Sequence, residues 1–182
     1  MKHSSEAGFS YIEIMIAMTI LLIGVLALLS AISAAVLLSS GQEQQLNAKQ
    51  MAASTMESLM SAKETDPSRL GWRVIGNVGT NPDVDGNPQG IFVGGRVQVT
   101  ENAGPDEVIG TADDSGAVIP GYQREIVITD ICDPDRPSPI CPTPGTFPIR
   151  IRRVDVSIFY WVGGISREER LSTVLTDYSI SE

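Results

Sequence analysis

One long apolar run dominates the first part of the chain. No charged residue occurs from Ile14 to Leu38. At about 1.5 Å per helical residue, a run of this length exceeds the ~30 Å core of a bilayer. A secretory signal peptide is the alternative, but its apolar region is usually only about 7–15 residues long. We therefore predict a membrane-spanning helix.

The helical pattern continues beyond the apolar run. The segment "GQEQQLNAKQMAASTMESLMSAKE" is rich in strong helix formers. Apolar side chains recur in it at helical spacing and predict a stripe that packs on the following domain: Ala48, Ala52, Met56, Leu59 and Met60. Asp66-Pro67 predicts the end of the helix, because the residue before a proline disfavours α-helical geometry. Ser39-Ser40-Gly41 is the predicted weak point, where the helix could bend.

From about Trp72 the pattern changes to the alternation that is typical of strands. In "IFVGGRVQVT" the apolar positions alternate, with Gly94-Gly95 as a predicted bulge. "REIVITDI" and "RRVDVSIFYWV" predict two further strands, and the apolar face of the second one comprises Val154, Val156, Ile158 and Tyr160. Gly163-Gly164 predicts the turn to a last strand, which completes a C-terminal hairpin.

These patterns predict an α+β fold. A long N-terminal α-helix spans a membrane with its first half and packs with its second half on a small antiparallel β-sheet. The net charge of −9 and the pI near 4.6 argue against nucleic-acid binding, which needs clustered basic residues. We interpret the one basic cluster, Arg150, Arg152 and Arg153, as an exposed strand face or a filament contact.

Several kinds of enzyme are disfavoured by the residue types present. His3 is the only histidine, and it lies close to the N-terminus. A domain without histidine has no histidine-based zinc site and no Ser-His-Asp triad. The sequence also contains no P-loop and no dinucleotide-binding fingerprint. We therefore expect no enzyme activity.

Glu13 stands at the entrance of the apolar run. A carboxylate at the edge of hydrocarbon costs a few kcal/mol unless it has a partner. A position at headgroup level is the alternative, but it does not account for the surrounding "GFSYIE". The segment "AGFSYIEIMIAMTILLIGVLALL" resembles the start of type IV prepilins and of the pseudopilins of type II secretion. Those proteins share a short polar leader, a Gly, a Phe, a glutamate fifth in the mature chain, and an apolar helix.

The resemblance implies a maturation step. A prepilin peptidase would cut between Gly8 and Phe9 and would methylate the new amine of Phe9. Glu13 would then pair with that amine, in its own subunit or in a neighbour. The chain would wait in a bacterial inner membrane with its N-terminus cytoplasmic, and would afterwards lie in a filament in the periplasm or outside the cell. Its partners would be other pilin subunits, the peptidase and an inner-membrane assembly platform.

The resemblance also suggests how the chain is organised. We expect a leader peptide at 1–8, a membrane and filament-core helix at 9–38, the outer half of the helix at 39–66, and a β domain at 67–182. The hairpin and the helix end "MESLMSAKE" look like those of minor pilins of the pilus-assembly type. A minor pilin is the leading expectation. The alternatives are a pseudopilin of a type II secretion system and a membrane-anchored, calcium-dependent adhesive module.

Two cysteines close a short proline-rich loop. Cys132 and Cys141 bracket "DPDRPSPI". In a domain that faces an oxidising compartment, such a pair predicts a disulfide, which would contribute roughly 2–3 kcal/mol to stability. Two free thiols are the alternative.

Two loops are rich in acidic residues. "ENAGPDEVIGTADDSG" resembles the calcium-binding loop of major pseudopilins, with Asp106, Asp113 and Asp114 as the expected ligands. Ca²⁺ takes six to eight oxygen ligands, which clustered acids and backbone carbonyls can supply. "NPDVDGNPQG" begins like an EF-hand at Asp83 and Asp85 but lacks the later ligands. For both loops a solvated turn is the alternative, because Asp, Asn, Gly and Pro are ordinary turn residues.

Overall fold

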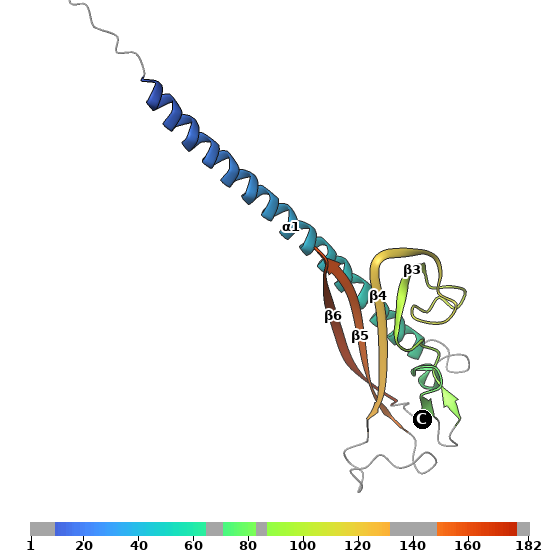
Figure 1. Ribbon diagram of the computed structural model, residues 1–182. Coiled ribbons are helices and arrows are strands. Elements are labelled where there is room, and N and C mark those ends of the chain that lie inside the picture. Colours follow the sequence, from blue (N-terminus) through green and yellow to red (C-terminus); the bar gives the residue numbers. More distant parts are fainter. Residues whose placement is uncertain (1–9, 65–70, 83–86, 132–148, 178–182) are drawn as a thin grey trace, which may run out of the picture. The chain divides into compact units, whose positions relative to one another are not determined.

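The computed structural model describes residues 10–64, 71–82, 87–131 and 149–177. One long helix, α1, is followed by a short 3-10 helix, η1, and six strands (Figure 1). Their bounds are α1 Tyr11–Glu64, η1 Trp72–Val74, β1 Asn81–Pro82, β2 Pro88–Gln89, β3 Arg96–Asn102, β4 Ser115–Ile131, β5 Ile151–Val162 and β6 Ile165–Thr176. The predicted α+β class is confirmed. The chain divides into an N-terminal unit, Met1–Gln42, and a β unit, Glu43–Glu182.

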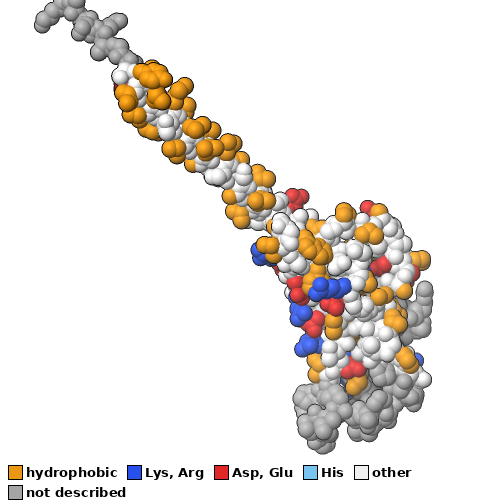
Figure 2. Space-filling view, in the orientation of Figure 1, with side chains coloured by type: hydrophobic (Ala, Val, Ile, Leu, Met, Phe, Trp, Pro, Cys, Tyr) orange, Lys and Arg blue, Asp and Glu red, His pale blue; other side chains and the backbone are white. Residues whose placement is uncertain are grey.

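The N-terminal unit contains the apolar part of α1. By length and composition, α1 is the one helix in the described part of the chain that could cross a membrane. Its side chains are exposed from Tyr11 to Ser40, and hydrophobic side chains cover most of the face that Figure 2 shows. The predicted weak point remains helical, and the Ser40 hydroxyl donates a hydrogen bond of 3.0 Å to the carbonyl of Leu37.

The β unit contains a four-stranded antiparallel sheet in the order β3-β4-β5-β6. β5 and β6 form the predicted hairpin, with Val162 opposite Ile165. Both turn glycines, Gly163 and Gly164, have positive φ angles of 57° and 85°, as a two-residue type I′ turn requires. The bulge predicted at Gly94-Gly95 is wrong, because β3 begins after it. The register shifts between β3 and β4 lie later, between Gln98 and Asn102.

The hydrophobic core of the β unit lies between the second half of α1 and one face of the sheet. The predicted helix stripe is buried at Ala48, Ala52, Met56 and Leu59, and the predicted strand face at Val154, Val156, Ile158 and Tyr160. Met60 is exposed, so its place in the stripe is wrong. It lies about 100° around the helix from Leu59, and Ala62 is buried instead.

Two asparagines complete the edge of β4 that β3 leaves unpaired. β3 pairs with β4 only as far as Arg96 opposite Glu125. Beyond it, the Asn77 side chain donates to the carbonyl of Ile126 and accepts from the amide of Ile128, both at 2.8 Å. Asn81 donates to the carbonyl of Ile128 at 3.4 Å. Buried backbone groups need such partners, and these amides act as a substitute strand.

Tyr160, in the core, is expected to make the stability of the β unit depend on pH in the alkaline range. It is buried and stacks on Tyr122 with ring centroids 6.4 Å apart. Burial, together with the charge of Glu169, raises the pKa of Tyr160 above the usual 10.0. The unfolded chain therefore ionises first as the pH rises above 10, so the Tyr160 contribution to stability is complete below that pH and lost above it. We expect Tyr160→Phe to unfold with a shallower loss of Tm in this range, measured by circular dichroism. Equal slopes in the variant and in the wild-type protein would contradict the prediction.

Candidate functional site

The acidic loop joins β3 to β4, and two of its carboxylates stabilise the loop itself. Asp106 accepts a hydrogen bond of 2.9 Å from the amide of Val108. Asp113 accepts one of 2.5 Å from the hydroxyl of Thr111 and one of 3.4 Å from the amide of Asp106. The bond from Thr111 is the main reason why the pKa of Asp113 lies below its usual value of 3.8. Asp106 and Asp113 are therefore neighbours, whereas the prediction placed Asp114 with them as a third ligand.

Asp114 has a different environment. The single N–H of Gly110 donates a bifurcated hydrogen bond to both carboxylate oxygens of Asp114, at 3.0 and 3.1 Å, and the carboxylate forms an ion pair with Arg124 of β4. Both partners of the ion pair are largely buried. Gly110 has a φ of 104°, and a Cβ there would lie 2.4 Å from Ile126, so the loop approaches the sheet closely only because this residue is glycine. Asp114 thus anchors the loop to the sheet.

The calcium prediction remains untested. Within the described residues, no group of three or more His, Cys, Asp or Glu side chains lies close enough to hold a metal ion. Asp106 and Asp113 are close, whereas Asp114 is bound to Arg124. In the other loop, Asp83 and Asp85 lie outside the described residues. Calcium binding by Asp106, Asp113 and Asp114 therefore stays a prediction from the sequence.

Isothermal titration of the full-length protein in detergent with CaCl₂ tests this prediction. Calcium binding through the loop requires heat that Asp113→Ala abolishes, because that variant removes the acid nearest to Asp106. Glu168→Ala, on β6, is the control and should leave the heat unchanged. Absence of heat in the wild-type protein would contradict the prediction.

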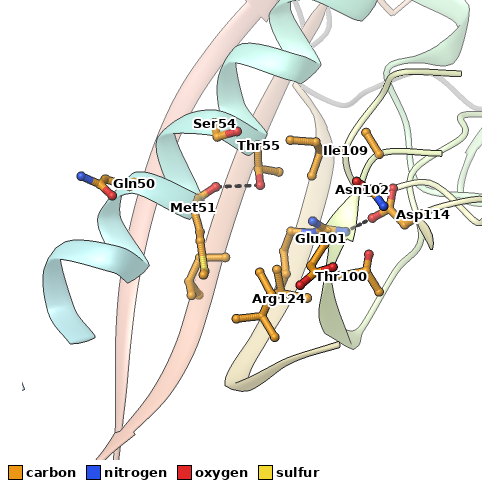
Figure 3. A pocket seen from close by; sticks show the side chains of 14 residues that line it. Gln50, Met51, Ser54, Thr55, Thr100, Glu101, Asn102, Ile109, Asp114 and Arg124 are labelled. Carbon is orange, nitrogen blue, oxygen red and sulfur yellow. Dashed lines mark hydrogen bonds and ion pairs between the residues drawn. The ribbon is translucent and has the colours of Figure 1, made fainter. Parts of the chain in front are cut away.

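A cavity of about 460 Å³ lies beside this loop, between the second half of α1, β3 and β4 (Figure 3). The Asp114–Arg124 pair forms part of its wall, together with the side chains of Thr100 and Glu101. Arg124 Nε and the Thr100 hydroxyl are buried without a hydrogen-bond partner among the described residues. Because Asp114 neutralises Arg124, the cavity wall presents a neutral pair beside the single carboxylate of Glu101.

A buried arginine is the feature that sequence reasoning missed. Arg152 is 1 % exposed, so its interpretation as an exposed strand residue or filament contact is wrong, whereas Arg150 and Arg153 are exposed. Arg152 Nε donates to Asp130 at 2.8 Å, and the guanidinium lies 4.8 Å from the centre of the Trp72 ring. The strand alternation contained the signal, because Arg152 has the same parity as the buried Val154.

The same guanidinium connects the segment after α1 to the sheet. Its Nη1 donates to the carbonyls of Trp72 and Ile75, at 2.9 and 2.5 Å. Asn81 donates to Asp130 at 3.0 Å, so the acid that pairs with Arg152 has a second partner. This hydrogen-bond network therefore stabilises the β unit.

The predicted processing residues lie at the other end of the chain. Gly8 and Phe9 lie outside the described residues, as do Cys132 and Cys141, so the cut, the methylation and the disulfide stay predictions. Glu13 lies in the first turn of α1, and its amide donates to the carbonyl of Ser10 at 3.0 Å.

The Glu13 side chain is exposed, and within the described part of the chain it has no ion-pair partner. Its neighbours Ile12 and Ile14 are exposed apolar residues. A carboxylate in such surroundings needs a cation once lipid or other helices cover the segment. Comparisons of the chain with models of protein families, with curated proteins and with solved structures found no match.

Proposed function

We propose that this chain is a minor pilin, a subunit of a type IV pilus-like filament that is processed after Gly8 and assembled through the N-terminal half of α1. One observation carries the proposal: a long helix whose first half is apolar and exposed has a carboxylate, Glu13, in its first turn, four residues after Phe9 of the Gly8-Phe9 pair. An ordinary membrane anchor needs neither the Gly-Phe pair nor the acid.

The exposed surface of the helix supports a role in lipid and in a helical assembly. Every large apolar side chain from Tyr11 to Leu38 is at least 46 % exposed. Soluble monomers rarely expose a contiguous apolar surface of this extent. The segment is long enough to span a bilayer, and the same surface can pack against identical helices after extraction. The membrane would hold the precursor, and neighbouring subunits would replace the lipid in the filament.

The spacing of Phe9 and Glu13 supports a role in assembly. Cleavage after Gly8 would make the Phe9 amine a new positive charge, four residues before Glu13. Along the processed chain, this amine would be the cation nearest to Glu13 in sequence. A buried ion pair is tolerated only when both partners are present, so a subunit in the wrong axial position would leave a charge unpaired. The pair would therefore specify the position of the subunit.

Mass spectrometry of the N-terminal peptide tests the proposal. We expect the sheared filament fraction of the source cell to contain a peptide that starts at methylated Phe9. The same peptide in the membrane fraction alone would favour the secretion pseudopilin instead. A chain that still starts at Met1, or that is cut after the apolar run, would contradict both.

A further inference from the structure

Three elements meet at one end of the β unit. The hydroxyl of Tyr122, on β4, donates to the carbonyl of Gln44, at the start of the helical part of this unit, at 3.4 Å. Tyr122 also pairs with Tyr160 in the sheet and stacks on it. The β5–β6 turn begins at Gly163, three residues after Tyr160, and the bend of β4 at Gly121 directly precedes Tyr122. The turn and the bend therefore lie at the end of the unit that holds Gln44.

The strand part of this end of the β unit has an apolar surface, whereas Glu43, next to Gln44 on the helix, is exposed. The two segments that form it, 115–123 and 156–166, contain no charged residue, although the chain has 13 basic and 22 acidic residues. Val118, Trp161 and Ile165 are 51, 40 and 62 % exposed. We call these three residues the end surface. The nearest charges after the turn are Arg167 and Glu168, on β6.

Connection along the chain favours lipid as the occupant of the end surface. The apolar run ends at Leu38, six residues before Gln44 in the same helix. Six helical residues span about 9 Å. A bilayer with a ~30 Å core is about 40–45 Å thick in total, so each headgroup layer is about 5–8 Å thick, slightly less than that distance. Tryptophan is enriched in this layer, where its ring contacts apolar chains and its N–H contacts water.

We propose that the end surface rests on the headgroup layer of the membrane that anchors the helix, with Trp161 and Ile165 inserted shallowly. The inference rests on the membrane-anchored precursor of the proposed function. It adds a second contact with the bilayer, made by the β unit itself. Extraction into a filament must then break this contact as well as withdraw the helix.

Fluorescence quenching by brominated lipid tests the inference on the full-length protein. The protein is reconstituted in phosphatidylcholine vesicles whose bromines lie on the acyl carbons nearest the headgroup. We expect a loss of Trp161 emission that Trp161→Phe abolishes. Trp72 serves as an internal reference, because its indole N–H donates to the carbonyl of Ile149 within the β unit and it lies beside Arg152.

A matched pair of variants tests the surface itself. Ile165→Asp should reduce the quenching of Trp161, because it places a charge in the end surface. Val174→Asp is the control: it lies on the same strand and is 54 % exposed, but it pairs with Arg153, far from the turn. Equal quenching in both variants, or none in the wild-type protein, would overturn the inference.

Leu28→Trp, made together with Trp161→Phe, separates this inference from membrane anchoring. If deep bromines quench the new tryptophan but shallow bromines do not quench Trp161, the end surface does not touch lipid although the helix spans the bilayer. If neither is quenched, the anchoring is wrong as well. A change in Trp161 emission that follows the protein-to-lipid ratio without bromine quenching would assign the surface to a second copy of the chain.

Discussion

Arg152→Met is expected to lower the free energy of unfolding of the β unit by about 3 kcal/mol. Removing one partner of a buried ion pair typically costs about 3–5 kcal/mol, because the other charge stays buried without compensation. The lower end of that range applies here, since Asp130 is 23 % exposed and keeps the hydrogen bond from Asn81. The carbonyls of Trp72 and Ile75 also lose their donor. Urea denaturation followed by the near-ultraviolet circular dichroism of the detergent-solubilised protein measures the effect.

Arg153→Met is the matched control for Arg152→Met. Arg153 is adjacent in the same strand but is 54 % exposed, and its ion pair with Asp155 lies at the surface. Exposed pairs contribute about 0–1 kcal/mol, so we expect a change within about 0.5 kcal/mol. The double variant Arg152→Met with Asp130→Leu should recover more than half of the loss, because no unpaired charge remains. Similar losses for Arg152→Met and Arg153→Met would contradict the structural role of Arg152.

The sequence predicted the elements whose signals are local. The C-terminal hairpin follows from alternation and from Gly163-Gly164, whose positive φ angles few other residues adopt. The helix stripe follows from spacing alone, apart from Met60. The structure confirms these features. They could be predicted because each depends on residues that lie close together in the sequence.

Contacts that depend on strand register could not be predicted in the same way. Arg152 lies directly opposite Asp130 in the sheet, and this ion pair offsets the cost of burying the charge of Arg152. Parity with Val154 would have placed Arg152 on the buried face. Without the register no partner could be named, and an unpartnered arginine is expected at the surface, as the sequence interpretation had it. The hydrogen bond from Asn77 to the carbonyl of Ile126 in β4 is a similar case, since these two residues are 49 positions apart in the sequence.

The acidic loop illustrates the same limit for a candidate site. Its three acids lie close in sequence, and the structure brings Asp106 and Asp113 together. Asp114 pairs instead with Arg124, ten residues later and on a strand. A cluster of acids in the sequence shows where a metal site could form. Basic side chains such as Arg124 compete with a metal for those acids, and only the tertiary fold shows which basic side chains are near.

Glu13→Ala is expected to leave processing intact and to reduce the chain in the sheared filament fraction by at least about tenfold. The peptidase cuts on the other side of Phe9, so methylated Phe9 should still be found in the membrane. In the filament core the Phe9 amine would have no partner. An unpaired charge there costs a few kcal/mol, and 1.4 kcal/mol already corresponds to tenfold in an equilibrium. Quantitative mass spectrometry of the N-terminal peptide in both fractions measures the two steps separately.

Three further variants determine whether charge is the cause. Glu13→Gln keeps the shape but not the charge and should fail as Glu13→Ala does, whereas Glu13→Asp keeps the charge and should restore part of the incorporation. Thr19→Ala is the control for a lost polar group in the same helix, because its hydroxyl bonds only locally, to the carbonyl of Met15 at 2.8 Å. We expect Thr19→Ala to assemble normally. Wild-type incorporation of Glu13→Ala would show that the acid does not position the subunit, and the proposed filament role would then lose its physical basis.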